Sequence, residues 1–356
     1  MNVKMLINKG RFPIRQMSTI GMLPSRLKVA YYRSQGAKIG DNVAIGPGSV
    51  IIADKIEVED GVQIGFGTFL RAREVKIGRF ARIGSTSFFD AESISIGEDA
   101  KISEQVFVGG LSSPESHFHL GARTILMQHS FINLARPVWI GDDTGIGGKC
   151  TIFSHGSWQN MLDGYPANFA PVTIGNNVWI PWQVFIMPGV TIGDGATIGA
   201  SSLVTKNIPA GALAVGSPAK VIRTSEQYPK KLTHAQKVEM LRQMMTEFCE
   251  HLEHEGVKIK RQRQPNQESI ILPVQPTDSR GVIVYCDAIS HLPDPSAATV
   301  ILSLVRLGEQ ERQGLESGQQ MWLDLESKER GGVSNSLGEE LAEFLKRYGV
   351  RFARTN

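Results

Sequence analysis

Large aliphatic residues recur at every sixth position over much of this chain, and this spacing excludes most folds. A period of six matches neither the 3.6-residue repeat of an amphipathic helix nor the two-residue repeat of a half-buried strand. It suits a coil of short strands joined by tight turns, in which each hexad forms one flat side and points one large side chain inward. The residues that carry the period are Ile39, Ile45, Ile51, Val58, Ile64, Leu70, Ile77, Ile83, Phe89, Ile96, Ile102 and Val108, and then Ile140, Ile146, Ile152, Ile174, Ile180, Ile186, Ile192, Ile198 and Val204.

Three hexads close a triangle, so each strand lies on the strand of the previous coil at a spacing of about 4.8 Å. No single coil can bury its inner face, and the core therefore forms only when many coils stack. The pattern predicts a mainly β fold, a parallel β-helix over residues 37–224 with roughly ten coils and a length of about 45 Å.

Two stretches interrupt the period, residues 109–138 and residues 154–171. Function is expected where a regular scaffold is interrupted. The second stretch opens with His155, directly after a predicted strand end, and contains Trp158, Asp163 and Tyr165. Aromatic faces and polar groups of this kind suit a sugar, because rings stack on it and polar groups bind its hydroxyls.

The second interruption and the repeats after it resemble a known family. The segment IFSHGSW at 152–158 and the stretch from Pro171 to Arg223, which ends in SPAKVIR, are similar to hexapeptide-repeat acyltransferases, especially the galactoside, maltose and polysaccharide O-acetyltransferases. The resemblance implies a left-handed β-helix that transfers an acetyl or other short acyl group from acyl-CoA to a sugar hydroxyl. It also implies a homotrimer with the active site between adjacent chains.

In the resembling enzymes the histidine after the strand is the catalytic base, and His155 takes that position. The role suits the chemistry, because an alcohol that attacks a thioester must lose its proton as the new bond forms, and a neutral imidazole accepts it near pH 7. A lone histidine is more often structural, and it is the placement of His155 that favours catalysis. No serine or cysteine stands beside a base by motif, so we expect direct transfer without an acyl-enzyme.

The same resemblance assigns the coenzyme A contacts. Cations there would meet the nucleotide phosphates, and a small alanine would allow the pantetheine arm to approach closely. Proline and tryptophan replace a glycine pair that is common in the family at positions 181 and 182. The positions implied for coenzyme A are Trp182, Ala200, Thr205, Lys206, Lys220 and Arg223, and those expected to bind the acceptor are Asn133, Trp158, Asp163 and Tyr165.

Other functions stay open at this point. An amino sugar or nucleotide sugar would make the enzyme an N-acyltransferase. A zinc carbonic anhydrase on the same scaffold would need three histidine ligands; His119 and His155 are suitably spaced, but Asn160 stands where another ligand is needed, so no metal is expected. A non-catalytic scaffold is disfavoured by the retained motifs. Asp163 would either orient His155, bind a sugar hydroxyl or lie solvated.

The chain begins with a basic segment, residues 1–36, that has no acidic residue. It would be either a transit peptide or an arm that contacts anionic lipid, or, as we favour, a helix over 25–34 that caps the β-helix. A net charge of +3 gives no reason to expect nucleic acid. Three scattered cysteines favour a reducing compartment, so we expect a cytoplasmic protein, or one at the inner face of the membrane.

After the last repeat, residues 225–232 read as a linker and residues 233–356 as a small α+β accessory domain that the resemblance does not cover. Helices are predicted over 233–256 and 337–348, with five strand-like runs between them. The charged run at 324–330 is expected to be solvated surface. We expect the domain to serve assembly or docking.

Overall fold

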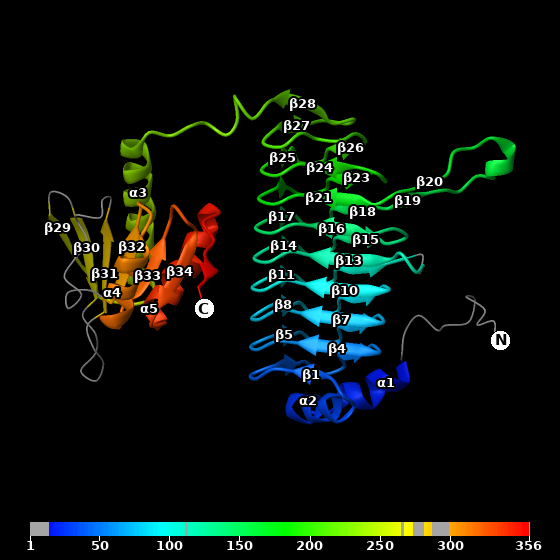
Figure 1. Cartoon of the computed structure of the whole chain (residues 1–356), viewed down its shortest axis with the longest axis horizontal. Helices are drawn as coiled ribbons and strands as arrows, with labels where there is room; N and C mark the ends of the chain where they lie inside the picture. The colour runs from blue at the N-terminus through cyan, green and yellow to red at the C-terminus, as the bar shows by residue number, and fades with distance from the viewer. Residues whose placement is uncertain (1–13, 111–112, 265–266, 273–280, 287–298, 356) are drawn as a thin grey trace. The chain divides into compact units, whose positions relative to one another are not determined.

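The computed structural model describes residues 14–110, 113–264, 267–272, 281–286 and 299–355. The chain divides into two compact units, Met1–Lys230 and Lys231–Asn356 (Figure 1). The predicted fold class, a left-handed parallel β-helix followed by a small α+β domain, is confirmed. No helix among the described residues has both the length and the apolar character to cross a membrane.

Three sheets, here named A, B and C, form the sides of the β-helix. Sheet A contains β1 (Lys38–Ile39), β4 (Lys55–Val58), β7 (Glu74–Ile77), β10 (Ser93–Ile96), β13 (His117–Leu120), β16 (Val138–Ile140), β21 (Val172–Ile174) and β24 (Thr191–Ile192). Sheet B contains β2 (Ala44–Ile45), β5 (Gln63–Ile64), β8 (Arg82–Ile83), β11 (Lys101–Ile102), β14 (Ile125–Leu126), β17 (Gly145–Ile146), β22 (Trp179–Ile180), β25 (Thr197–Ile198), β27 (Leu213–Val215) and β28 (Lys220–Arg223). Sheet C contains β3 (Val50–Ile52), β6 (Phe69–Arg71), β9 (Phe88–Asp90), β12 (Phe107–Gly109), β15 (Phe131–Asn133), β18 (Thr151–Phe153), β23 (Phe185–Ile186) and β26 (Leu203–Val204).

The hexad aliphatics stack in register inside the column. Ile45 pairs with Ile64 and Ile64 with Ile83, all three of them buried. Glycine follows the aliphatic residue because the corners of successive coils touch. A Cβ on Gly46 would lie 2.6 Å from the carbonyl carbon of Gly65, closer than van der Waals contact allows.

The predicted interruption at residues 109–138 is for the most part not present in the structure. Residues 109–138 contain a complete coil, β13 to β15, whose inward residues Leu120, Leu126 and Ile132 keep the six-residue spacing and are buried. Only the turn between β12 and β13 departs from the period. The column also has eight complete coils instead of about ten, because extra residues at the corners and the segment 154–171 lengthen individual coils.

The N-terminal segment covers the first coil, as the favoured interpretation predicts. It contains α1 (Ile14–Ser18), η2 (Ile20–Met22) and α2 (Ser25–Ser34). Within α2, the hydroxyls of Ser25 and Tyr32 accept hydrogen bonds from the amides of Ile45 and Ile51 at 2.9 and 2.8 Å. Lys28 is fully buried and donates to carbonyl oxygens of the same coil. These bonds satisfy strand groups that would otherwise form an open edge. Residues 1–13 of the predicted basic arm lie outside the described residues.

The second unit is a mixed sheet with helices on both faces. The sheet order is β29 (Lys260–Gln264), β30 (Gln267–Leu272), β31 (Gly281–Cys286), β32 (Val300–Ser303), β33 (Met321–Asp324), β34 (Glu329–Gly332) and β35 (Ala353–Arg354). On one face α3 (His234–His254) and α5 (Ser336–Leu345), which continues into η5 (Lys346–Tyr348), share a core with the sheet. On the other face α4 (Glu309–Ser317) inserts Leu315 against Trp322. The sequence predicted two of these three α-helices.

The charged run at 324–330 is not simply solvated surface. Asp324 is fully buried and accepts hydrogen bonds from the amides of Leu307, Glu326 and Ser327. Arg330 is also buried and forms an ion pair with Glu339 at 2.9 Å. These two side chains hold the loops and the helix at the sheet ends, which explains why charged residues lie inside this unit.

Candidate active site

His155 lies where the chain leaves sheet C and would turn into sheet A, a place named here the CA corner. Instead of turning, the chain forms a two-stranded arm from β19 (His155–Gly156) and β20 (Asn168–Phe169), with η3 (Met161–Asp163) at its far end. Figure 1 shows this arm projecting from the side of the column. His155 therefore stands at the base of the arm, against the coils.

The buried residue Ser154 fixes the backbone at this corner. Its hydroxyl accepts hydrogen bonds from the amides of Ala135 and Arg136 at 2.8 and 2.9 Å and donates to the carbonyl of Asn133 at 2.9 Å. One hydroxyl thus joins the arm to the preceding coil. Three bonds to backbone groups leave little freedom for the residue that follows it.

Aromatic rings lie on both sides of the His155 imidazole. The ring of Phe169 is stacked at 5.5 Å and that of Phe153 at 6.3 Å, measured between centroids. The guanidinium of Arg136 lies over the outer ring, Phe169, at 5.6 Å. Burial lowers the pKa of His155 below its ordinary value of 6.5, so the imidazole is mainly neutral at pH 7.

Two polar atoms at the CA corner are buried and have no hydrogen-bond partner among the residues that the structure describes. They are Nδ1 of His155 and Oδ1 of Asn133. Asn133 lies on the strand directly below, where it pairs with Phe153. Buried polar atoms in native proteins are nearly always satisfied, and two exceptions at one corner point to a ligand or a partner that supplies their bonds. The predicted acceptor residue Asn133 therefore does lie next to His155.

The other residues predicted to bind the acceptor lie along the arm. Trp158 is 99% exposed and Tyr165 46% exposed. The Asp163 carboxylate accepts a hydrogen bond from Asn160 at 3.0 Å within the tip of the arm. It has no hydrogen bond to His155 among the described residues, so Asp163 does not orient the imidazole within the chain.

Trp182 and Ala200 lie together at a different place, the BC corner, where the chain passes from sheet B to sheet C. The amide of Ser201 donates to the carbonyl of Trp182 at 3.0 Å, which stacks the two turns directly. The indole of Trp182 lies over Gly148 of the coil below, where a Cβ would come within 2.6 Å of the ring. Both residues are exposed, as expected for a surface that a ligand covers.

The remaining residues predicted for the cofactor lie near the end of the column. Thr205 and Lys206 follow β26 and so belong to the CA corner, above His155. Lys220 and Arg223 lie on β28, the hairpin strand that closes sheet B. All four side chains are exposed, and none of the three cations forms an ion pair among the described residues.

A single chain does not bring His155 and Trp182 together. The register pairs Thr151 with Phe185, which places the two residues at opposite edges of sheet C. At about 3.3 Å per residue the separation along the coil is roughly 20 Å. A site that needs both residues must therefore use two chains.

The histidines on β13 form no metal centre with other described residues. His117 and His119 lie on β13, where His117 bonds to Ser93 at 2.8 Å and His119 stacks on Trp139 at 4.5 Å. Among the residues that the structure describes, no group of three histidine, cysteine or acidic side chains could hold a metal ion.

The sequence reasoning missed a ladder of phenylalanines on the outer face of sheet C. Neighbouring rings are 4.8 to 5.8 Å apart between centroids, and the last ring but one also faces His155. The ladder contains Phe69, Phe88, Phe107, Phe131, Phe153 and Phe185. The signal was present, because an aromatic residue precedes the inward residue in four successive sheet C strands from β6 to β15.

Comparison with known proteins agrees with the repeat. The family model described as "Bacterial transferase hexapeptide (six repeats)" matches residues 171–206, and "Hexapeptide repeat of succinyl-transferase" matches residues 36–72. WcaF of Escherichia coli (strain K12), named as an acetyltransferase of colanic acid biosynthesis, is 37% identical over 105 residues, which cover 26% of this chain and 58% of that protein. Galactoside O-acetyltransferase of the same strain is 40% identical over 110 residues, which cover 30% of this chain and 54% of that protein.

The chain therefore spans little more than half the length of these relatives. Among solved structures, UDP-N-acetylglucosamine acyltransferase from Campylobacter jejuni matches 59% of this chain and 79% of its own, at 18% identity and a TM-score of 0.43. The hexad column and the matches to repeat models and curated acetyltransferases agree. Residues 36–72 and 171–206 match hexapeptide-repeat models of transferases, and the chain is similar to curated acetyltransferases.

Proposed function

We propose that this protein transfers an acetyl or other short acyl group from acyl-CoA to a hydroxyl of a sugar or polysaccharide precursor, with His155 as the general base. The observation that carries the proposal is the CA corner, where a largely neutral imidazole lies at the base of an exposed aromatic arm. One buried nitrogen of this imidazole has no hydrogen-bond partner within the described part of the chain. The names of the two relatives, an O-acetyltransferase of a galactoside and an acetyltransferase of colanic acid biosynthesis, support the reaction class.

The chemistry is a direct transfer. The His155 imidazole accepts the proton of the acceptor hydroxyl as its oxygen attacks the thioester carbonyl. The tetrahedral oxyanion collapses, the carbon–sulfur bond breaks, and the imidazolium returns the proton to the departing thiolate. The products are the acyl ester and free coenzyme A, and His155 is neutral again. Hydrogen-bond donors near the coil stabilise the oxyanion.

The acceptor lies along the arm and the CA corner. Trp158 and Tyr165 offer exposed rings for stacking on a sugar, and the unsatisfied Oδ1 of Asn133 accepts a bond from one of its hydroxyls. The Asp163 carboxylate at the tip of the arm accepts a hydrogen bond from another sugar hydroxyl. This set suits a carbohydrate acceptor.

The donor lies in the groove that Trp182 and Ala200 begin. Thr205 and Lys206 at the CA corner of the neighbouring chain extend it, and the exposed cations Lys220 and Arg223 meet the nucleotide phosphates of coenzyme A. No metal takes part in this mechanism.

A homotrimer would complete the site. If sheet C of each chain faces a three-fold axis, the CA corner of one chain meets the BC corner of the next, and His155 comes beside the neighbour's Trp182 and Ala200. The upper part of the phenylalanine ladder supports this arrangement, because contiguous apolar surface marks interfaces. Its partly buried rings are Phe107, Phe131, Phe153 and Phe185.

Among the described residues, Cys150 is a buried free thiol, which fits a reducing compartment. On that ground we place the reaction in the cytoplasm, with the chain taking part in polysaccharide biosynthesis.

The test is the release of free thiol from acetyl-CoA in the presence of a panel of sugars and nucleotide sugars. Wild type is expected to be active with at least one hydroxyl acceptor, and His155→Ala to be slower by about 10² to 10⁴. His117→Ala, which removes a histidine from sheet A, is the matched control and should keep full activity.

Two outcomes would contradict the proposal. Full activity in His155→Ala would show that His155 is not the general base. Activity with amino sugars alone, with the acyl group found on nitrogen, would replace hydroxyl transfer by the N-acyltransferase alternative.

A further inference from the structure

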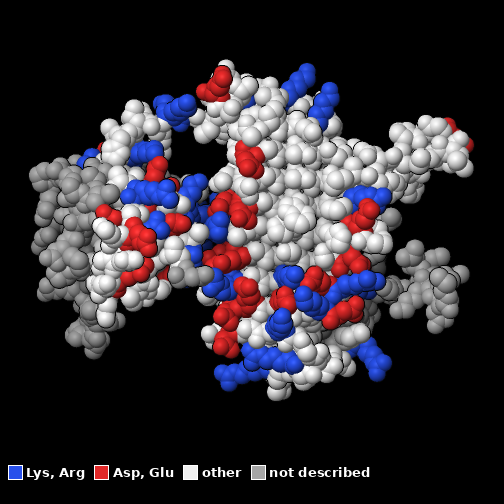
Figure 2. Space-filling model, viewed as in Figure 1, with Lys and Arg blue, Asp and Glu red and all other residues white. Residues whose placement is uncertain are grey.

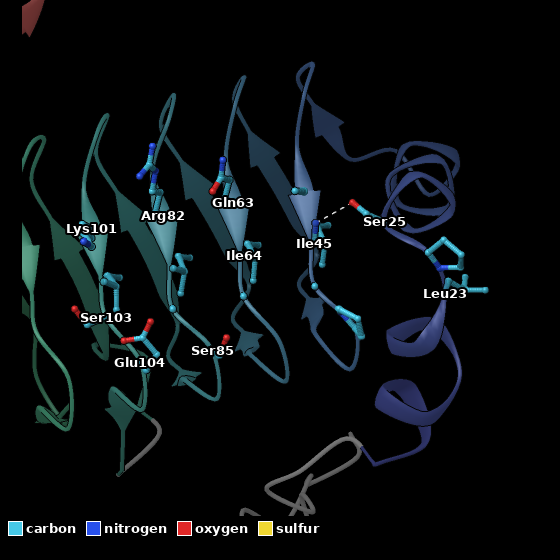
Figure 3. A pocket seen from close by; sticks show the side chains of 18 of the residues that line it. Leu23, Ser25, Ile45, Gln63, Ile64, Arg82, Ser85, Lys101, Ser103 and Glu104 are labelled. Carbon is cyan, nitrogen blue, oxygen red and sulfur yellow. Dashed lines mark hydrogen bonds between the residues drawn. The ribbon is translucent and has the colours of Figure 1, made fainter. Parts of the chain in front are cut away.

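A groove of about 700 Å³ lies on the lower part of sheet B, far along the column from His155. Its floor consists of β2, β5, β8 and β11, and the segment from Met22 to Ser25 forms one wall (Figure 3). The groove crosses four stacked coils, a distance of about 14 Å at the spacing of parallel strands. It is open and elongated, a shape that suits a chain better than a compact ligand.

Two cations stand side by side in this groove. Arg82 and Lys101 are register partners on neighbouring strands, and Gln63 continues the same row (Figure 3). All three side chains are exposed. Like charges directly opposite each other on a sheet are destabilising, so the free protein carries an electrostatic cost here.

Elsewhere on these coils the charges are neutralised. Between residues 38 and 136 the described chain has eight other lysines and arginines, and each forms an ion pair with a carboxylate. Part of this network is the band of alternating charge over the lower coils in Figure 2. Arg82 and Lys101 have no ion pair among the described residues. The two cations that lack a carboxylate are thus the two that line the groove.

The rest of the lining is polar in a way that suits hydroxyl groups. Ser85 and Ser103 lie at the turns after the two cationic strands, and the Glu104 carboxylate is exposed beside them (Figure 3). Amide, hydroxyl and carboxylate groups together offer donors and acceptors to a sugar.

We propose that this groove binds an acidic saccharide chain, in which a carboxylate or phosphate pairs with Arg82 and Lys101. The choice of a saccharide rests on the proposed function, whereas the requirement for an anion rests on the two cations alone. The groove is a second carbohydrate site, separate from the CA corner, and it retains a long acceptor on the enzyme.

The test is calorimetric titration of the full chain, without acyl-CoA, using oligosaccharides of equal length. The probes are an oligogalacturonate, a phosphorylated maltooligosaccharide and the uncharged maltooligosaccharide. We expect at least one charged probe to bind at least about tenfold more tightly than the uncharged one, and Arg82→Gln/Lys101→Gln to lose that difference. Lys38→Gln/Arg73→Gln removes the same charge from β1 and from the turn before β7, outside the groove, and should bind like wild type.

Whichever charged probe binds identifies the anion as carboxylate or phosphate. The proposal is overturned if neither charged probe binds, if the uncharged probe binds equally well, or if both double variants behave alike. Failure of the active-site proposal would look different. His155→Ala should still bind the charged oligosaccharide, and Arg82→Gln/Lys101→Gln should still acylate a short uncharged acceptor.

Discussion

The backbone around the proposed base depends on the buried hydroxyl of Ser154. Ser154→Ala would leave two amides, those of Ala135 and Arg136, without an acceptor in the interior. Each unsatisfied group costs about 1 to 3 kcal/mol, so we expect the loss of two to lower the free energy of unfolding by roughly 2 to 6 kcal/mol in urea titrations. Activity should fall as well, because the turn that positions His155 loosens.

Ser95→Ala is the matched control. The Ser95 hydroxyl lies on the outer face of β10 and makes no hydrogen bond among the described residues, so the change should stay within about 0.5 kcal/mol. Equal stability losses in the two variants would show that the Ser154 bonds contribute little.

If His155 is the general base, as proposed, the acid limb of the pH–rate profile should report its titration. Burial lowers the pKa of this residue, which means that its neutral, proton-accepting form persists below pH 6.5. We therefore expect kcat/KM to be level near pH 7 and to fall only as the pH drops below about 6.5, with one proton taken up. A limb centred above pH 7 would contradict the assignment, and His117→Ala should leave the profile unchanged.

Among the structural elements, sheet C differs from its two companions in its outer face. Sheet A carries ion pairs over its lower coils and sheet B carries cations. Sheet C instead carries stacked phenylalanines, of which Phe69 and Phe88 are buried and the others partly buried. In Phe107→Glu a carboxylate would stand between the rings of Phe88 and Phe131, and the proposed trimer should dissociate. Analytical ultracentrifugation is expected to show monomers with little activity.

The control for this change is Ile125→Glu, on the outer face of β14 in sheet B. It adds the same charge to a face that the proposed trimer leaves open, so the oligomer should persist. Circular dichroism melting separates dissociation from unfolding. A trimer that survives in Phe107→Glu would rule out sheet C as the interface.

The elements also show how far the sequence could be interpreted. Inward residues are periodic, so the hexads predicted the three sheets and their parallel pairing. The helix over 25–34 was predicted separately, from the basic segment at 1–36. The coil of β13 to β15 was not predicted although Leu120, Leu126 and Ile132 keep the period. Leu120 follows Val108 by twelve residues instead of seven, so the triplet is out of step with the preceding coils. Outward residues obey no period, and their packing depends on neighbours one coil away.

The sequence predicted individual residues of the candidate site, but it did not predict how these residues contact one another. Position along the chain located His155 at the base of an inserted segment. It could not show that Ser154 ties this segment to the preceding coil, nor that Asp163 bonds to Asn160 instead of the imidazole. Those contacts depend on the path of the arm, which the repeat does not determine.

At the scale of the whole molecule, the positions of His155 and Trp182 at opposite edges of sheet C lead to a test by complementation. His155→Ala removes the base, and Ala200→Tyr would block the thioester groove beside Trp182, so each variant alone should be inactive. In a heterologous ring, every site combines the CA corner of one chain with the BC corner of its neighbour. Mixed trimers would therefore contain some sites in which both corners are intact.

If the two variants are unfolded together in equal amounts and refolded, chains assemble at random and about one quarter of the sites receive an intact His155 and an intact groove. Thiol release should then recover to about one quarter of the wild-type rate. Mixing the variants without unfolding is the control and should give no recovery while the trimers stay assembled. If both corners of a working site came from one chain, no mixture would regain activity, because every chain carries one defect. Recovery would show that the reaction takes place between chains. Packing through the aromatic face of sheet C would then hold His155 of one chain beside the donor groove of the next.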